Sequence, residues 1–313
     1  MMNKEKNFVS AVLYVHNDEA KVKDFLETII RELEDHFEHT EIICVNDAST
    51  DKSTDKIREA AEKAESTGIT ILNMSYFHGV ELAMNAGVDL AIGDFVFEFD
   101  TVYADYDPSF IMEVYRTSLQ GYDIVSASPD RKERFSSHLF YKVFHRFSDL
   151  SYEMTTESFR ILSRRVINRI SSLTNTAPYR KAVYAGSGLK TKTLRYAPTS
   201  AQTRAIGGKE KKYRSALAID SLLLFTEVGY RLSMAMTLLM MFVSGFMVLY
   251  SLITYFLAHP VEGWTTTILF LSVAFFGLFA ILTIIVKYLQ LLLNMVFKRK
   301  HYNFESIEKI TRA

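Results

Sequence analysis

The chain has 313 residues, and its 36 Lys and Arg balance 36 Asp and Glu, so the formal net charge is zero. This balance excludes a whole-molecule electric field that would attract nucleic acid. A single cysteine, Cys44, excludes a disulfide within the chain, and its apolar neighbours favour a buried thiol in a reducing compartment.

Strands and helices alternate from the beginning of the chain. Residues 8–16 predict a buried strand because they are almost continuously apolar, and residues 19–37 predict an amphipathic helix from their apolar spacing. Further strands and helices alternate over residues 41–45, 51–67, 69–75, 79–91 and 94–100. This alternation predicts a mostly parallel α/β sheet wrapped by helices.

A polar turn, residues 46–51, directly follows the apolar strand 41–45. In an open parallel sheet, ligands bind beyond the carboxyl ends of the strands, so a site is expected here. Ser49 or Asp51 also suits the N-terminus of the next helix, because short polar side chains cap helices. Capping does not account for Asp47.

Two uncharged stretches, residues 237–257 and 267–286, are each long enough to cross about 30 Å of hydrocarbon as a helix. The alternative is a pair of buried core helices. Lys and Arg flank the pair and are absent from the link between them, which predicts that both ends lie in the cytoplasm. The amino terminus has no apolar stretch of secretory type, so we expect the bulk of the chain to be cytoplasmic.

A basic segment precedes the first uncharged stretch and carries Arg204, Lys209, Lys211, Lys212 and Arg214. Such a cluster beside a membrane suits a lipid phosphate, and it suits anionic headgroups in general equally well. The apolar residues 215–225 that follow predict either an interfacial helix or a packed core helix.

Several stretches resemble motifs of family 2 glycosyltransferases. SAVLYVHNDEA and VNDASTDKS are similar to the family's V-P-V-Y-N-E-E and V-D-D-G-S-T-D turns, and FHGVELAMNAGVDLAIGDFVFEFD to the stretch that leads to its metal motif. TTESFRILSRRVI and RAIGGKEKKYRSALAIDSLLLF are similar to its D-F-R-L-x-x-R and R-x-x-G-x-S-K-Y segments. The resemblance covers nearly the whole chain and is strongest to the membrane-anchored polyprenyl-phosphate and dolichol-phosphate sugar synthases.

The resemblance implies a GT-A fold, an α/β domain with a mostly parallel sheet, followed by juxtamembrane helices and a two-helix transmembrane hairpin. The expected divisions are a catalytic domain, a basic juxtamembrane segment, the hairpin and a cytoplasmic tail at residues 1–203, 204–234, 235–296 and 297–313. Self-association is compatible with the resemblance.

The implied activity is that of an inverting glycosyltransferase at the cytoplasmic face of the inner membrane. It would move one sugar from a UDP- or GDP-sugar to polyprenyl (undecaprenyl) phosphate, with Mg²⁺ or Mn²⁺ as cofactor, for modification of a cell-envelope glycan or lipid. The alternatives are a different lipid acceptor and a catalytically silent scaffold that binds a nucleotide sugar.

The resemblance also assigns roles to individual residues. Nucleotide-sugar binding falls on Val15, Asn17, Glu19, Asp47, Ser49, Gly79 and Asp94, with Asp47 contacting the base. Catalytic roles fall on Asp100, Asp105, Glu157 and Arg160, and lipid-phosphate binding on Arg131, Arg134, Arg204, Lys209 and Lys212.

The sequence departs from the family's pattern at two of these motifs. Val102 stands where the second carboxylate of the metal motif is expected, and Ser158 where an Asp is expected. The implied metal ligands are therefore Asp100 and Asp105, and Glu157 is the expected replacement for the missing Asp.

Overall fold

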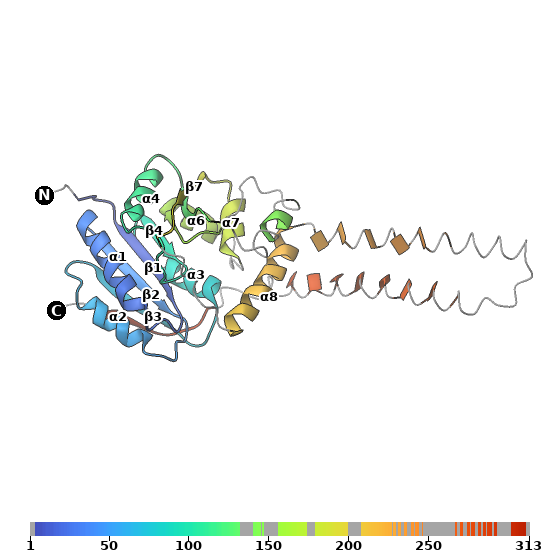
Figure 1. Cartoon of the computed structure of the whole chain (residues 1–313), viewed down its shortest axis with the longest axis horizontal. Helices are drawn as coiled ribbons and strands as arrows, with labels where there is room; N and C mark the ends of the chain where they lie inside the picture. The colour runs from blue at the N-terminus through green and yellow to red at the C-terminus, as the bar shows by residue number, and fades with distance from the viewer. Residues whose placement is uncertain are drawn as a thin grey trace, which may run out of the picture. The chain divides into compact units, whose positions relative to one another are not determined.

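The computed structural model describes residues 4–131, 140–144, 146, 156–173, 179–199, 208–226 and 302–310, and scattered positions between 228 and 292. By its internal contacts the chain divides into two units. The first comprises Met1–His145, Leu150–Leu217 and Arg299–Ala313, and the second comprises Arg146–Asp149 and Ala218–Lys298. The first unit is an α/β domain (Figure 1).

An eight-stranded sheet forms the centre of this domain, in the order β7-β5-β6-β4-β1-β2-β3-β8. Strands β1 to β4 run parallel to one another, whereas β6 is antiparallel to its neighbours β4 and β5, and β8 is antiparallel to β3. The strands are β1 (Val9–Val15), β2 (Thr40–Asn46), β3 (Gly68–Met74), β4 (Phe95–Phe99), β5 (Ile124–Pro129), β6 (Phe159–Ser163), β7 (Thr191–Tyr196) and β8 (Phe304–Ile310).

Helices cover both faces of the sheet (Figure 1). The helices include α1 (Val22–His36), α2 (Ser53–Ala61), α3 (Val80–Leu90), α4 (Phe110–Ser118), α6 (Arg164–Leu173), α7 (Arg180–Gly186) and α8 (Gly208–Phe225). One apolar core joins the sheet to α1, α2 and α4, and a second core joins the opposite face to α3, α6 and α7.

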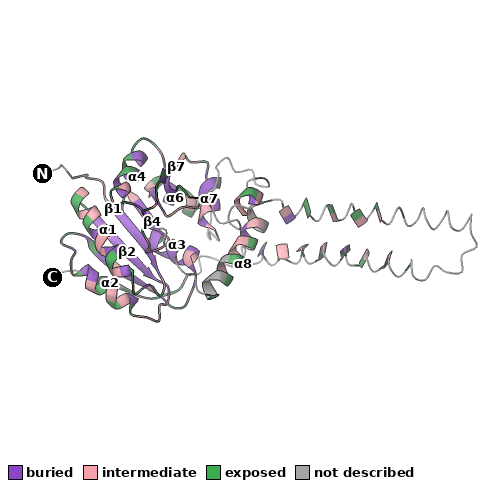
Figure 2. Ribbon diagram, viewed as in Figure 1, coloured by how far each residue is buried: buried purple, intermediate pink, exposed green. Residues whose placement is uncertain are grey.

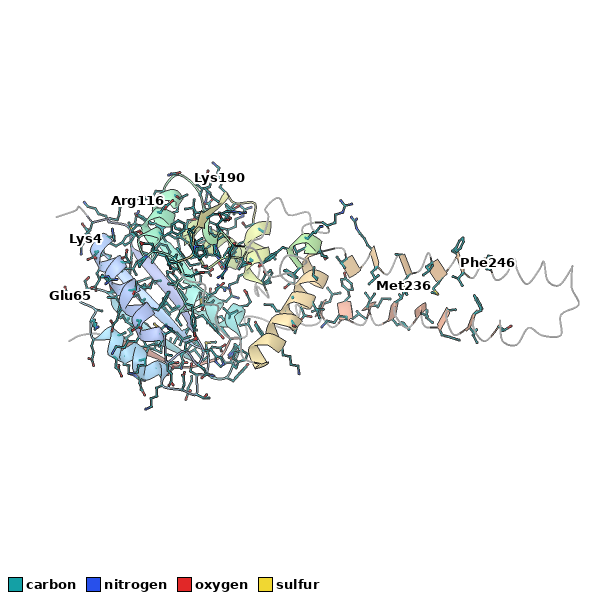
Figure 3. All side chains as sticks on the ribbon, viewed as in Figure 1. Lys4, Glu65, Arg116, Lys190, Met236 and Phe246 are labelled. Atoms are coloured by element: carbon teal, nitrogen blue, oxygen red, sulfur yellow. The ribbon has the colours of Figure 1, made fainter. Side chains whose placement is uncertain are left out.

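Strand β1 explains why the core has two layers. Its side chains alternate between the faces, so that Ala11 and Leu13 enter the first core while Val12 and Tyr14 enter the second. All seven residues of β1 are buried, as expected of a central parallel strand covered on both sides (Figure 2). Charged side chains such as Lys4, Glu65, Arg116 and Lys190 lie at the periphery of the domain (Figure 3).

The strands and helices predicted up to residue 100 are confirmed, with boundaries that shift by a few residues. The mixed sheet with its parallel centre agrees with the predicted GT-A class. The tail predicted at 297–313 requires a correction, because β8 lies within it and completes the sheet of the catalytic domain.

Within the part of the chain that the structure describes, no helix combines the length and the apolar character needed to cross a membrane. The stretches 237–257 and 267–286 are described only at scattered positions, so the predicted hairpin stays a prediction.

Gly87 allows α3 to lie close to the sheet. A Cβ atom at this position would lie 2.4 Å from Cγ1 of Val12 and 2.6 Å from Cγ2 of Val45. Alanine favours a helix over glycine by about 1 kcal/mol, but overpacking a core costs about 1–3 kcal/mol. We therefore expect Gly87→Ala to lower the free energy of unfolding by about 1 kcal/mol in a urea titration.

The matched control is Gly68→Ala, since an added Cβ there has no atom within 4 Å. Its unfolding free energy should stay within about 0.5 kcal/mol of wild type. A Gly87→Ala variant as stable as wild type would contradict this packing.

Candidate active site

The candidate site lies at the carboxyl ends of the parallel strands. Val15 ends β1, Asn46 ends β2, and Asp100 directly follows β4. The polar turn at residues 46–51 therefore lies at the edge of the sheet where ligands bind in open α/β folds.

The loops that follow β1 and β2 are joined by hydrogen bonds. Ser49 Oγ accepts a hydrogen bond from the Asn17 amide (3.1 Å), and Asn17 Oδ1 accepts one from the Thr50 amide (2.8 Å). The Glu19 amide donates to Asp51 Oδ2 (3.0 Å). Three of the predicted nucleotide-sugar ligands, Asn17, Glu19 and Ser49, are thus brought together.

Asp51 accounts for the start of α2. Its Oδ1 accepts a hydrogen bond from the Ser53 amide (3.0 Å), the first residue of the helix. Burial alone would raise the pKa of Asp51, but hydrogen bonds from Ser53 and from the Glu19 amide outweigh this effect and lower it. Asp51 therefore supports the helix start, whereas Ser49 bonds to Asn17 instead.

Asp47 is completely buried. One carboxylate oxygen accepts a hydrogen bond from the His78 amide (2.8 Å). The other accepts from the Gly79 amide (2.8 Å) and from the Tyr14 hydroxyl (2.9 Å). The carboxylate of Asp47 therefore holds the loop after β3, and its contact with the nucleotide base stays a prediction.

Gly79 has a structural reason to be glycine. Its φ is +83°, and an added Cβ would lie 2.3 Å from Cζ of Tyr213 in α8. Its amide bonds to Asp47, so Gly79 holds the loop between β3 and α3, and its part in nucleotide-sugar binding stays a prediction.

Asp100 belongs to a largely buried group of charges that we call the ionic cluster. It consists of Glu81, Glu98, Asp100, Glu157, Arg160, Arg180 and Lys181. These residues come from α3, β4, β6, α7 and the adjoining loops. Four carboxylates face three cations, so the cluster carries one net negative charge.

Arg160 lies opposite Glu98 in the antiparallel pairing of β4 with β6. Its guanidinium lies 2.9 Å from a carboxylate oxygen of Glu98 and 2.9 Å from one of Asp100. Its Nε lies 3.0 Å from Glu157. Arg160 is 1% exposed and is fully engaged by carboxylates, so it holds the site together and is not placed to contact a phosphate.

Arg180, at the start of α7, is likewise buried and surrounded by carboxylates. It lies 3.0 Å from Glu81, 2.8 Å from Glu98 and 2.5 Å from Asp100, and is 1% exposed. Both oxygens of Asp100 thus bond to a guanidinium. Burial alone would raise the pKa of Asp100, but the charges of Arg180 and Arg160 outweigh burial and hold it well below its usual range.

Asp105 lies in a second polar group. One of its oxygens accepts a hydrogen bond from the Tyr196 hydroxyl, and the other lies 3.3 Å from Arg131. The Ser158 hydroxyl lies 2.5 Å from that of Tyr196. Burial, together with the hydrogen bond to Asp105, raises the pKa of Tyr196.

The two predicted metal ligands do not form a ready-made metal site. Both oxygens of Asp100 bond to arginines, both oxygens of Asp105 have partners, and Val102 is a buried core residue. An ion on Asp100 would lie beside two guanidinium groups that cannot reach water. Among the described residues, no three carboxylate, histidine or cysteine side chains gather as metal ligands.

Other predicted residues lie elsewhere. Asp94 precedes β4, at the opposite end of the strand from Asp100, and its carboxylate accepts a hydrogen bond from the Phe8 amide (3.0 Å). This hydrogen bond places Asp94 as a support of the strand end, and its role in nucleotide-sugar binding stays a prediction. Lys212 lies on α8 and is exposed, and Arg134, Arg204 and the side chain of Lys209 lie outside the described residues.

No sequence motif singles out Glu81, Glu98, Arg180 or Lys181. A signal existed for Glu98, because a glutamate within the apolar strand 95–99 needs a buried partner. A cavity beside the ionic cluster is lined in part by Glu157, Lys181 and Tyr184. Lys181 has a 13% exposed side chain, compared with 1% for Arg180 and 2% for Arg160.

Residues 10–171 match the family described as Glycosyl transferase family 2. This segment is more than half of the chain and contains the loops after β1 and β2, Asp100 and Arg160. The protein therefore belongs to glycosyl transferase family 2, which confirms the predicted class.

Three curated relatives are similar over part of their length. An uncharacterised glycosyltransferase of Synechocystis is 30% identical over 188 residues, covering 58% of each chain. An undecaprenyl-phosphate 4-deoxy-4-formamido-L-arabinose transferase of Aeromonas hydrophila is 33% identical over 127 residues, covering 40% of this chain and 38% of the relative. A prophage bactoprenol glucosyl transferase homologue of Escherichia coli is 28% identical over 195 residues, covering 60% and 62%. The matches thus span less than two thirds of these relatives.

Similar solved structures include the glucosyl-3-phosphoglycerate synthase of Mycobacterium tuberculosis with Mn²⁺, UDP-glucose and phosphoglyceric acid. The identity is 15% and the TM-score 0.49, with 69% of this chain and 78% of that chain covered.

The enclosure of Asp100 predicts a stability effect. We expect Asp100→Asn to lower the free energy of unfolding by about 3 kcal/mol in a urea titration, because the substitution leaves two buried guanidinium groups short of a charged partner. The control is Asp130→Asn, whose ion pair with Arg195 is 3.7 Å long and largely exposed. That substitution should change the unfolding free energy by less than about 0.5 kcal/mol. Equal effects of the two substitutions would contradict the role given to Asp100.

The lowered pKa of Asp100 also predicts a pH dependence. Its stabilising effect is fully present above the unfolded pKa of about 4 and is lost as the pH falls toward the lower folded value. The difference in unfolding free energy between wild type and Asp100→Asn should therefore be constant from about pH 8 to 5 and shrink below about pH 4. A difference that grew on acidification would show that Asp100 is not held as an anion.

Proposed function

We propose that the protein is an inverting glycosyltransferase that moves one sugar from a UDP- or GDP-sugar to a polyprenyl phosphate at the cytoplasmic face of the inner membrane. The observation that carries the proposal is the family match over residues 10–171, which coincides with the polar loops at the carboxyl edge of the sheet. Two relatives carry names that include undecaprenyl phosphate and bactoprenol. These names support a polyprenyl phosphate as the acceptor.

In the proposed reaction, a phosphate oxygen of the acceptor forms a bond to the anomeric carbon while the bond to the nucleotide diphosphate breaks. A phosphate monoester has a second pKa of about 6, so it is largely ionised at neutral pH. The acceptor therefore attacks without a strong general base. Asn17, Glu19 and Ser49, at the joined loops, are the proposed nucleotide ligands, with the Val15 backbone beside them.

Negative charge grows on the leaving diphosphate, and positive side chains nearby stabilise it. We assign this role to Lys181, whose side chain is the most exposed of the three cations in the ionic cluster. Arg131, with a 38% exposed side chain beside Asp105, is the proposed ligand of the lipid phosphate. Arg134, Arg204, Lys209 and Lys212 stay predicted contacts of the same phosphate. Glu157 lies 3.8 Å from Lys181 and orients it, while Arg160 holds Glu157 and is itself paired with Asp100.

Mg²⁺ or Mn²⁺ on Asp100 and Asp105 stays a prediction, and no step is assigned to it because the arginines occupy the carboxylates. The predicted hairpin, residues 235–296, would hold the domain at the membrane, and self-association would be compatible with this arrangement. The enclosed Asp100 and the valine at position 102 favour a second candidate, a silent scaffold that binds a nucleotide sugar without transferring it.

The test is transfer of labelled sugar from a panel of UDP- and GDP-sugars to undecaprenyl phosphate by the purified full-length chain in detergent, with Mg²⁺, Mn²⁺ or chelator. We expect one sugar to enter the lipid fraction. Nucleotide binding without transfer from any donor would favour the scaffold. Transfer that is abolished by chelator would restore Asp100 and Asp105 as metal ligands.

Arg131 gives a sharper test, because its substitution leaves the ionic cluster intact. We expect Arg131→Gln to lower kcat/KM for transfer by about tenfold or more through a higher KM for undecaprenyl phosphate, since a charged hydrogen bond is lost. The control is Arg195→Gln, which removes an exposed arginine paired only at 3.7 Å with Asp130. Equal kcat/KM values for the two variants would remove Arg131 from the site.

A further inference from the structure

Strand β8 belongs to the catalytic domain although it lies at the far end of the sequence. The chain leaves the first unit after Leu217 and returns to it at Arg299. Residues 304–310 then pair with β3 along the edge of the sheet. This strand lies outside residues 10–171, the segment that matches the family.

A row of polar side chains connects β8 to the first loops of the site. The row runs through Asn46, Asn73 and Ser306, which lie opposite one another across β2, β3 and β8 in the register of the sheet. The side-chain amide nitrogen of Asn73, Nδ2, donates hydrogen bonds to Ser306 Oγ (3.0 Å) and to Glu308 Oε1 (3.0 Å). Its Oδ1 accepts a hydrogen bond from the Asn46 side chain (2.9 Å).

From Asn46 the row continues into the loops. Asn46 Oδ1 accepts a hydrogen bond from the Ser49 amide (3.1 Å), and Ser49 Oγ accepts one from the Asn17 amide (3.1 Å). An amide side chain whose two ends are both engaged has a fixed orientation. β8 therefore fixes the orientation of the Asn73 side chain, and Asn73 in turn fixes the orientation of the Asn46 side chain. Asn46 then orients the loop that carries Ser49.

A second connection runs through His78. The Asn303 amide, directly before β8, donates to Nε2 of His78 (3.2 Å), while Nδ1 lies 2.5 Å from the carbonyl oxygen of Tyr76. These partners assign the proton to Nδ1 and leave Nε2 as the acceptor. The backbone amide of His78 bonds in turn to Asp47. This route ends in the loop between β3 and α3 and shares no side chain with the first.

We propose that β8 and the residue before it are a positioning element of the donor site. The element holds the loop after β2 through Asn73 and the loop after β3 through His78, and so fixes the two loops in the geometry that binds a nucleotide. The assignment of these loops to a nucleotide rests on the proposed function. A strand that only covers the edge of the sheet would not need to bond to either loop.

Two variants of the full-length chain test the two connections separately. Asn73→Ala removes the side chain that links β8 to Asn46, and Asn303→Pro removes the amide hydrogen that His78 accepts. The matched controls are Arg58→Gln, which breaks an exposed ion pair with Glu308, and Asn303→Ala, which keeps the backbone amide. Thermal unfolding confirms that each variant is folded before it is compared.

The first readout is hydrogen exchange of the loop amides. We expect Ser49 and Thr50 to exchange about 5- to 30-fold faster in Asn73→Ala, and His78 and Gly79 to do so in Asn303→Pro, with both controls unchanged. The second readout is the Kd for UDP and GDP, which should rise by a similar factor. Loop exchange within about twofold of wild type in both variants would overturn the proposal.

The two readouts separate this inference from the proposed function. Wild type that transfers sugar, with loop exchange unaffected in both variants, would overturn the inference alone. Wild type that neither binds nucleotide nor transfers sugar, with faster exchange in the variants, would overturn the proposed function and leave β8 as the element that holds the loops. A change in one variant only would retain that connection and remove the other.

Discussion

The site depends on two arginines that have almost no contact with water. A buried guanidinium is tolerated only when carboxylates surround it, so Arg160 and Arg180 require acids from several elements. Glu81 comes from α3, Glu98 from β4 and Glu157 from the segment before β6. The arginines therefore tie the helical layer on one face to the centre of the sheet, and their geometry determines where Asp100 lies.

This arrangement changes how the departures from the family pattern are understood. The missing carboxylate at Val102 accompanies an Asp100 whose oxygens are both bonded to arginines. The more exposed charges, Arg131 with a 38% and Lys181 with a 13% exposed side chain, lie at the margins of the buried network. The chemistry proposed for this protein therefore relies on side chains at the rim, while the interior provides rigidity.

The sequence predicted those parts of the fold that local pattern determines. Apolar runs and helical spacing located the first four strands because each is buried on both sides. The pairing of Glu98 with Arg160 was beyond prediction, since it requires the register of an antiparallel strand some 60 residues away. β8 was missed because Phe304, Ile307 and Ile310 are spaced by three, which hides the alternation of a strand. The sequence places Asp47 in the polar turn after β2, but its enclosure depends on tertiary contacts that the motif does not reveal.

The return of the chain to the sheet at β8 has a consequence for biosynthesis. A ribosome makes β1 to β7 first and β8 last, with both uncharged stretches between them. Until residues 304–310 emerge, β3 is an open edge, and Asn73 lacks two of its partners. The nascent domain thus reaches its complete hydrogen bonding only after residues 237–257 and 267–286 have been synthesised. A chain truncated before β8 by an early stop codon would expose the unpaired backbone N–H and C=O groups of β3, which can pair with strands of other proteins.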